Sequence, residues 1–158
     1  PVFYRPEVWR ELEQNLLLFY TKFKRDSSDV LRIQERGAKN NRLILKQMKD
    51  LVSILQDVLS TGKNLNRIGE ILHQNWVLKR KLADCITSST IDKYYEEALK
   101  AGAVGGKLLG AGGGGFLLFY VELQNQKAVI QALSSLHYLK VGLDTGGTRI
   151  TYYDQTVI

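Results

Sequence analysis

The chain of 158 residues is long enough for one domain with a hydrophobic core of its own. Apolar residues make up 44% and charged residues 24% of it, as in an ordinary soluble globular protein, and no apolar run reaches the ~20 residues of a membrane span. The net charge is +6, but acidic residues are interspersed with the basic ones along the chain, which favours solvated helix faces over a basic stripe that binds nucleic acid. The single cysteine, Cys85, excludes an internal disulfide and fits a cytoplasmic location.

Two short elements are predicted at the start of the chain. Pro6 suits a first helical turn, with Glu7 and Glu11 close behind it, so a helix is expected to about Gln14. The apolar run 16–20 is short and compact, which is typical of a buried strand.

A long helical pattern follows these two elements. Asp26 or Ser27 can cap a helix, and apolar residues then recur at helical spacing as far as Val58, with Gly62 as the stop. The pattern predicts one long helix or two collinear helices over residues 26–62.

Another helix is predicted to begin at one of two asparagines, Asn64 or Asn66. Its apolar face includes Trp76, and Lys79 is a further candidate for that face. His73 lies beside the face without a second histidine or a carboxylate one turn later, so we expect it to be packed or hydrogen-bonded rather than bound to a metal.

The second half of the chain mixes strands and helices. Apolar spacing and turn signals predict a helix over about 91–101, a strand from 116, a helix after Asn125, a strand over 138–143, a hairpin-type turn at 144–147 and a strand over 148–153. This order of elements makes an α+β domain. We expect an antiparallel sheet of about four strands, covered on one face by helices.

Residues 102–115 contain eight of the 14 glycines. Glycine tolerates positive φ and close backbone approach, and consecutive backbone N–H groups can bind an anion. Gly110, Gly112 and Gly115 match G-x-G-x-x-G, but a β-rich run follows where a dinucleotide site needs a helix, and Lys107 is followed by Leu108 rather than the Ser or Thr of a P-loop. Both standard phosphate motifs therefore fail. A tight turn that lets the helix 91–101 pack near the sheet is the structural alternative.

A third phosphate-related pattern fits the same stretch. Residues 107–115 read Lys-Leu-Leu-Gly-Ala-Gly-Gly-Gly-Gly and resemble the third conserved motif of the galactose/homoserine/mevalonate/phosphomevalonate (GHMP) kinase superfamily. Residues 15–21, 73–79 and 91–95 are similar to its bacterial heptose-phosphate kinase branch, which phosphorylates the anomeric hydroxyl of D-glycero-D-manno-heptose 7-phosphate. The similarity covers nearly the whole chain but only the C-terminal half of such a kinase.

The resemblance implies a ferredoxin-like sheet with extra helices, and it implies ATP and Mg²⁺ as cofactors. In these kinases the third motif lines the active-site cleft, with its amides facing the cleft. The matching residues here are Gly110, Ala111, Gly112, Gly113 and Gly114. Lys107, at the start of the motif, either steers phosphates or simply flanks a strand.

The resemblance also implies a substrate-side segment. Thr21 and Arg25 match a family pattern of Thr-Gly followed by Arg, whereas Lys22 stands in place of the glycine. The alternative for this segment is a solvated basic turn before a helix.

The remaining chemistry is expected outside this chain. The family's main ATP-binding loop, its aspartate base and its magnesium ligand belong to an N-terminal domain, so we assign no catalytic or metal-binding residue here and expect the chain alone to be inactive. Its first residue, Pro1, suggests a fragment. The expected partners are that N-terminal domain and a sugar or sugar phosphate, with neither nucleic acid nor membrane, and a homodimer is allowed.

Two other functions remain open from the sequence. One is a stand-alone ferredoxin-like ligand-binding or regulatory domain without catalysis, which the coding sequence upstream of Pro1 would distinguish from a kinase. The other is an RNA-binding sheet, which needs aromatic side chains on an exposed strand face; Tyr120, Tyr152 and Tyr153 are the candidates.

Overall fold

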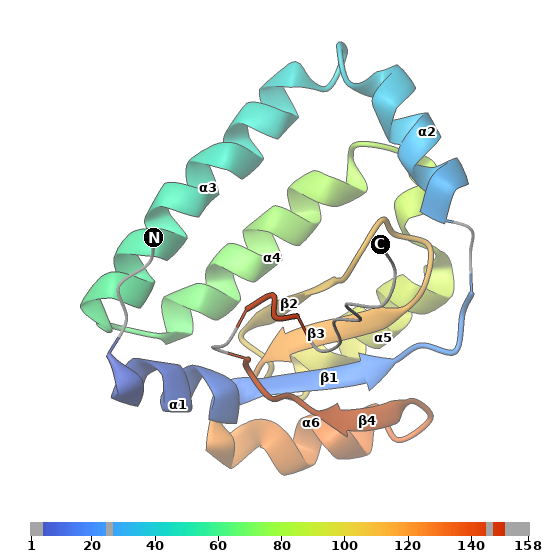
Figure 1. Cartoon of the computed structure of the whole chain (residues 1–158). Helices are drawn as coiled ribbons and strands as arrows, with labels where there is room; N and C mark the ends of the chain where they lie inside the picture. The colour runs from blue at the N-terminus through green and yellow to red at the C-terminus, as the bar shows by residue number, and fades with distance from the viewer. Residues whose placement is uncertain (1–4, 25–26, 145–146, 151–158) are drawn as a thin grey trace, which may run out of the picture.

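The computed structural model describes residues 5–24, 27–144 and 147–150. The described residues form α-helices, two short 3-10 helices (η) and strands. Figure 1 shows how the α-helices and strands are arranged. In chain order the elements are α1 (Pro6–Asn15), β1 (Leu16–Tyr20), α2 (Ser27–Gly37), α3 (Arg42–Thr61), α4 (Asn66–Arg80), η1 (Asp84–Ile86), α5 (Ser89–Lys100), β2 (Gly105–Leu108), β3 (Phe116–Tyr120), η2 (Leu123–Asn125), α6 (Gln126–Ala132) and β4 (His137–Lys140).

Among the described residues, four strands form one antiparallel sheet in the order β2-β3-β1-β4. β1 is central, since its Leu18 lies opposite Leu118 of β3 on one side and Leu139 of β4 on the other. A strand, a helical crossover, a hairpin and a second helical crossover give the ferredoxin-like arrangement. The predicted α+β class and the antiparallel sheet of about four strands are confirmed.

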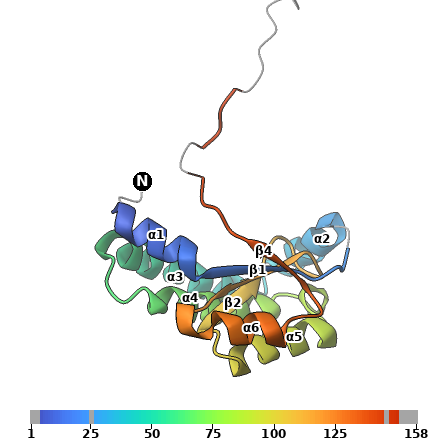
Figure 2. The ribbon, with the colours of Figure 1, turned by 90° about the horizontal axis from the view of Figure 1, so that it is seen from below.

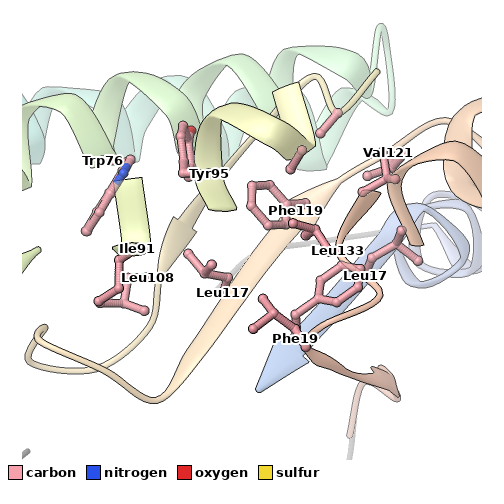
Figure 3. Close-up of a cluster of buried hydrophobic side chains, with 14 of the residues drawn as sticks. Leu17, Phe19, Trp76, Ile91, Tyr95, Leu108, Leu117, Phe119, Val121 and Leu133 are labelled. Carbon is pink, nitrogen blue, oxygen red and sulfur yellow. The ribbon is translucent and has the colours of Figure 1, made fainter. Parts of the chain in front are cut away.

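Helices α5 and α6 cover one face of this sheet, as the view from below in Figure 2 shows. Alternate residues of the two central strands point to that face because successive strand side chains point in opposite directions. Figure 3 shows the resulting cluster, in which the rings of Tyr95 and Phe119 lie 5.4 Å apart and Trp76 is fully buried. Each large apolar side chain buried in this way contributes about 1.5–3 kcal/mol.

A second apolar cluster forms where α1, α3 and α4 meet β1 and β3. Its buried members are Val8, Leu12, Leu16, Val58, Leu65, Ile68, Ile71 and Tyr120. The Tyr120 hydroxyl accepts a hydrogen bond from Asn15 Nδ2 at 3.0 Å. Tyr120 is therefore a core residue, and the prediction that it could be an exposed aromatic for RNA stacking is wrong. The other two candidates, Tyr152 and Tyr153, lie outside the described residues.

The helical pattern of residues 26–62 is divided between α2 and α3, which are not collinear (Figure 1). The chain turns after Gly37, and the side chain of Asn41 donates from Nδ2 to the carbonyl of Leu82 at 2.9 Å. A single straight helix would carry Asn41 away from this carbonyl. The turn directs α2 towards the β2–β3 loop and leaves α3 packed along α4.

The glycine-rich stretch contains a strand that periodicity did not predict. β2 begins at Gly105, and an added Cβ there would lie 2.1 Å from the carbonyl oxygen of Gly69 on α4. A Cβ on Gly69 would in turn lie 2.7 Å from Val104 Cβ. These glycines let α4 press directly onto the sheet edge, so the helix that needs them is α4 and not the predicted 91–101 helix.

The C-terminal strand also differs from its prediction. β4 spans His137–Lys140 rather than residues 138–143. Val141 and Leu143 leave the sheet and pack against the second cluster, where the Leu143 amide donates to Glu13 Oε1 at 3.2 Å. Residues 147–150 form no strand, and the rest of the predicted turn and of the strand 148–153 lies outside the described residues.

Candidate functional site

The candidate site is the glycine loop, residues 109–115, which joins β2 to β3. Gly110, Gly112, Gly113 and Gly115 all have positive φ, between 71° and 120°. L-residues with a side chain avoid this region at a cost of about 1–2 kcal/mol each. The backbone conformation at these four positions therefore explains why the sequence has glycine there, as predicted.

Hydrogen bonds hold one side of the glycine loop to the body of the domain. The amide of Gly113 donates to the carbonyl of Ile86 at 2.8 Å, and the amide of Gly115 donates to the carbonyl of Phe23 at 3.1 Å. On the α2 side, Gln34 donates from Nε2 to the Ala111 carbonyl at 2.8 Å. The Gly113 amide therefore faces Ile86 rather than an open cleft, which departs from the expectation for that residue.

The other side of the glycine loop is open. It borders a pocket of about 490 Å³ whose lining residues are Tyr20, Phe23, Lys24, Leu109, Gly110, Ala111, Gly112, Gly114, Gly115 and Phe116. In the part of the chain that the structure describes, no group accepts a hydrogen bond from the amides of Gly110, Ala111, Gly112 or Gly114. Successive amides without internal acceptors are the kind of backbone arrangement that binds anions.

Close packing explains two of the glycines that line the pocket. A Cβ on Gly112 would lie 2.9 Å from Ile86 Cα, and one on Gly114 would lie 2.5 Å from the carbonyl oxygen of Phe23. By contrast, a Cβ on Gly110 or Gly115 would meet no atom of the described residues within 4 Å. The loop is therefore pressed onto its support by its middle glycines, while Gly110 and Gly115 are needed for backbone conformation.

Two lysines lie near Gly110, and neither of them lines the pocket. Lys79 of α4 is only 8% exposed and donates from Nζ to the Gly110 carbonyl, whereas Lys107 of β2 donates to Asn75 Oδ1 at 2.8 Å. Burial lowers the pKa of Lys107. Burial, and then the charge of Lys107, lowers the pKa of Lys79 to about 8. Lys107 thus belongs to β2, and phosphate steering by Lys107 stays a prediction.

The Lys79 contact with the loop was not predicted as part of the site. The available signal was a lysine on the apolar face of a helix, three residues after Trp76, where a charged side chain needs a specific partner.

Of the two predicted substrate-binding residues, the structure describes only Thr21. Thr21 is 2% exposed, and both its amide and its hydroxyl donate to the Gly115 carbonyl at 2.9 Å, so it anchors the loop. Arg25 lies outside the described residues. A substrate contact by Thr21 or Arg25 stays a prediction. Lys22 has φ 65°, the left-handed conformation that glycine adopts freely and that residues with a side chain disfavour.

His73 has a hydrogen-bonding role, as expected. Its Nδ1 lies 2.9 Å from the hydroxyl of Tyr95, which also donates to the Gly106 carbonyl at 3.0 Å and accepts from the Gly106 amide at 3.2 Å. Burial raises the pKa of Tyr95 to about 12. Among the described residues, no group of three or more His, Cys, Asp or Glu side chains could hold a metal ion.

The family of this chain follows from sequence comparison. Residues 46–139, more than half of the chain, match the family described as GHMP kinases C terminal, and the chain belongs to that family. The match includes the whole glycine loop together with Lys79 and Lys107.

Two curated relatives are longer kinases. The D-glycero-alpha-D-manno-heptose 7-phosphate kinase of Campylobacter jejuni subsp. jejuni serotype O:2 is 28% identical over 128 residues, which cover 78% of this chain and 37% of that protein. The bifunctional fucokinase/GDP-fucose pyrophosphorylase of Arabidopsis thaliana is 30% identical over 125 residues, which cover 77% of this chain and 12% of that protein. The chain thus spans well under half the length of either relative.

Solved structures share the fold. Methanococcus jannaschii mevalonate kinase matches with a TM-score of 0.71 and 22% identity over 85% of this chain and 41% of that one. Streptococcus pneumoniae phosphomevalonate kinase, in complex with phosphomevalonate and AMPPNP, matches with a TM-score of 0.67 and 22% identity over 80% of this chain and 38% of that one. In the described part of the chain, no helix is both long and apolar enough to cross a membrane.

Proposed function

We propose that this chain is the C-terminal half of an ATP-dependent sugar or sugar-phosphate kinase, acting in the cytoplasm on the anomeric hydroxyl of a heptose 7-phosphate. The observation that carries the proposal is the open side of the glycine loop, where the amides of Gly110, Ala111, Gly112 and Gly114 border a pocket. The similarity to the Campylobacter heptose 7-phosphate kinase supports the choice of substrate.

The loop suits phosphate rather than a neutral ligand. Phosphoryl transfer depends mainly on positioning and on neutralising charge at the phosphate oxygens. Backbone amides supply this without a side chain that would occupy the space, and the anchors at Ile86, Phe23 and Thr21 fix the direction in which they point. In the proposed enzyme ATP supplies the transferred phosphoryl group, and this chain contributes one wall of the cleft.

The other wall belongs to a domain that we place upstream of Pro1. It would supply the aspartate base, the Mg²⁺ ligand and the main nucleotide-binding loop, because the described residues offer no metal cluster. We therefore expect the isolated chain to transfer no phosphate, and robust kinase or ATPase activity of the isolated chain would refute this division of labour.

The test uses the full-length protein. Phosphoryl transfer from ATP is measured with heptose 7-phosphate, fucose and galactose as acceptors. Ala111→Asp, which places a carboxylate among the loop amides, is expected to reduce kcat/KM at least tenfold, whereas Ser53→Asp on the exposed side of α3 should leave it unchanged. Equal activities of the two variants, or no activity with any sugar, would refute the proposal in favour of a non-catalytic domain.

A further inference from the structure

Two lysine side chains lie beside the glycine loop, and the charge of one affects the pKa of the other. Lys79 extends from α4 and Lys107 from β2, and these elements pack directly through Gly69 and Gly105. Lys79 holds the Gly110 carbonyl and Lys107 holds the side-chain oxygen of Asn75. Neither lysine forms an ion pair with any carboxylate among the described residues.

The neighbouring cations of α4 are paired differently. Arg80, next in the chain to Lys79, reaches Asp92 at 3.0 Å, and Arg67 pairs with Glu70. An ammonium group carries three N–H donors, and in the described part of the chain Lys79 and Lys107 each use one. Buried charges are usually paired, because burial without a partner is unfavourable. The lysine pair therefore has both the charge and the free donors to receive an anion.

We infer that Lys79 and Lys107 together bind a phosphate group at the Gly110 end of the loop, with Asn75 positioning Lys107. This inference rests on the proposed kinase function and names residues for its phosphate contacts. Two ammonium groups match the charge of a phosphate dianion, and lysine binds phosphate as a point charge. The phosphate belongs either to the nucleotide or to the phosphorylated sugar.

A purely structural role makes a different prediction. Lysine stems can pack along apolar surface and leave their ammonium groups to bond nearby carbonyls. In that case ligand binding would leave the protonation of Lys79 unchanged, and loss of either charge would not change ligand affinity. The groups facing Lys79 in the described structure are Lys107 and the Gly110 carbonyl, so a bound anion would supply the missing negative charge.

The first measurement needs no substitution. The full-length protein is titrated calorimetrically at pH 8 in buffers of different ionisation enthalpy, with MgATP in the absence of sugar and with heptose 7-phosphate in the absence of nucleotide. Because the pKa of Lys79 is about 8, close to half of the molecules carry a neutral Lys79. An anion bound to the pair should draw in roughly half a proton. No proton uptake with either ligand would contradict the inference.

The second measurement uses Lys79→Met and Lys107→Met, with Lys81→Met at the exposed end of α4 as the control. Each of the first two should weaken binding at least tenfold for one of the two ligands, and Lys79→Met should abolish the proton uptake. A loss confined to MgATP assigns the phosphate to the nucleotide, and a loss confined to heptose 7-phosphate assigns it to the sugar.

The two proposals can fail separately. Unchanged affinities in both variants, in a protein that still phosphorylates its sugar, would overturn the lysine pair and leave the kinase function intact. If the wild-type protein transfers no phosphate, inorganic phosphate becomes the titrant: binding that Lys79→Met weakens tenfold supports the pair, and binding that it leaves unchanged overturns it.

Discussion

Replacing Lys79 by methionine is expected to stabilise the ligand-free chain. The shift of the Lys79 pKa from 10.5 to about 8 means that the folded state disfavours the charged side chain. At 1.36 kcal/mol per pKa unit, this corresponds to about 3 kcal/mol at pH 7. Methionine has a similar length and carries no charge, but it loses the hydrogen bond to Gly110, which is worth about 1–2 kcal/mol. The net gain in the free energy of unfolding should be about 1–2 kcal/mol.

The stability gained by replacing Lys79 depends on pH. Below pH 8 Lys79 is charged in both the folded and the unfolded chain, so the unfavourable burial is fully present. Between pH 8 and 10.5 only the unfolded chain keeps the proton, and the wild type becomes more stable as the pH rises. About 2 kcal/mol of the destabilisation should be gone by pH 9.5, so the advantage of Lys79→Met should be close to zero there.

Urea denaturation of the wild type, Lys79→Met and Lys81→Met at pH 7 and pH 9.5 measures these differences. Comparing variant with wild type at each pH removes the contributions of titrating groups that do not interact with Lys79, such as Tyr95 and Tyr120, whose pKa values are raised by burial. A Lys79→Met chain that is less stable than the wild type at pH 7 would show that the bond to Gly110 outweighs the buried charge and would refute the reasoning.

Three further predictions concern the support of the loop. Gly105→Ala should destabilise the chain by at least about 3 kcal/mol, because its Cβ would overlap the Gly69 carbonyl, whereas Gly142→Ala, with 3.6 Å to its nearest neighbour, should change the unfolding free energy by less than about 0.5 kcal/mol. Tyr95→Phe should lose about 1–3 kcal/mol, since it leaves both backbone groups of Gly106 without their partner; a loss below about 0.5 kcal/mol would mean that water replaces the hydroxyl. Lys22→Gly should gain about 0.5–1 kcal/mol by relieving the positive φ, and thermal unfolding that shows a decrease would mean that the bond from Lys22 to Ser135 matters more.

Local patterns in the sequence predict most helices and the two central strands. The proline at the start of α1, the apolar run of β1 and the spacing in α5 act within a few residues, so the chain alone specifies them. The glycine loop belongs to the same class, because four of its positions require a backbone conformation that side chains disfavour. Membership of the GHMP kinase family likewise rests on the sequence of this loop and its surroundings.

Tertiary contacts decided what local patterns could not. Gly105 and Gly106 have no strand propensity, and they form β2 because β3 pairs with them and α4 packs against them without intervening side chains. Residues distant in the chain meet at the loop, as when Lys79 reaches Gly110 and Thr21 reaches Gly115. The periodicity of the sequence does not predict these long-range contacts, because they depend on how α4 and β1 are placed around the loop. The sequence therefore specified the backbone of the candidate site, while the fold determined which charges and anchors surround it.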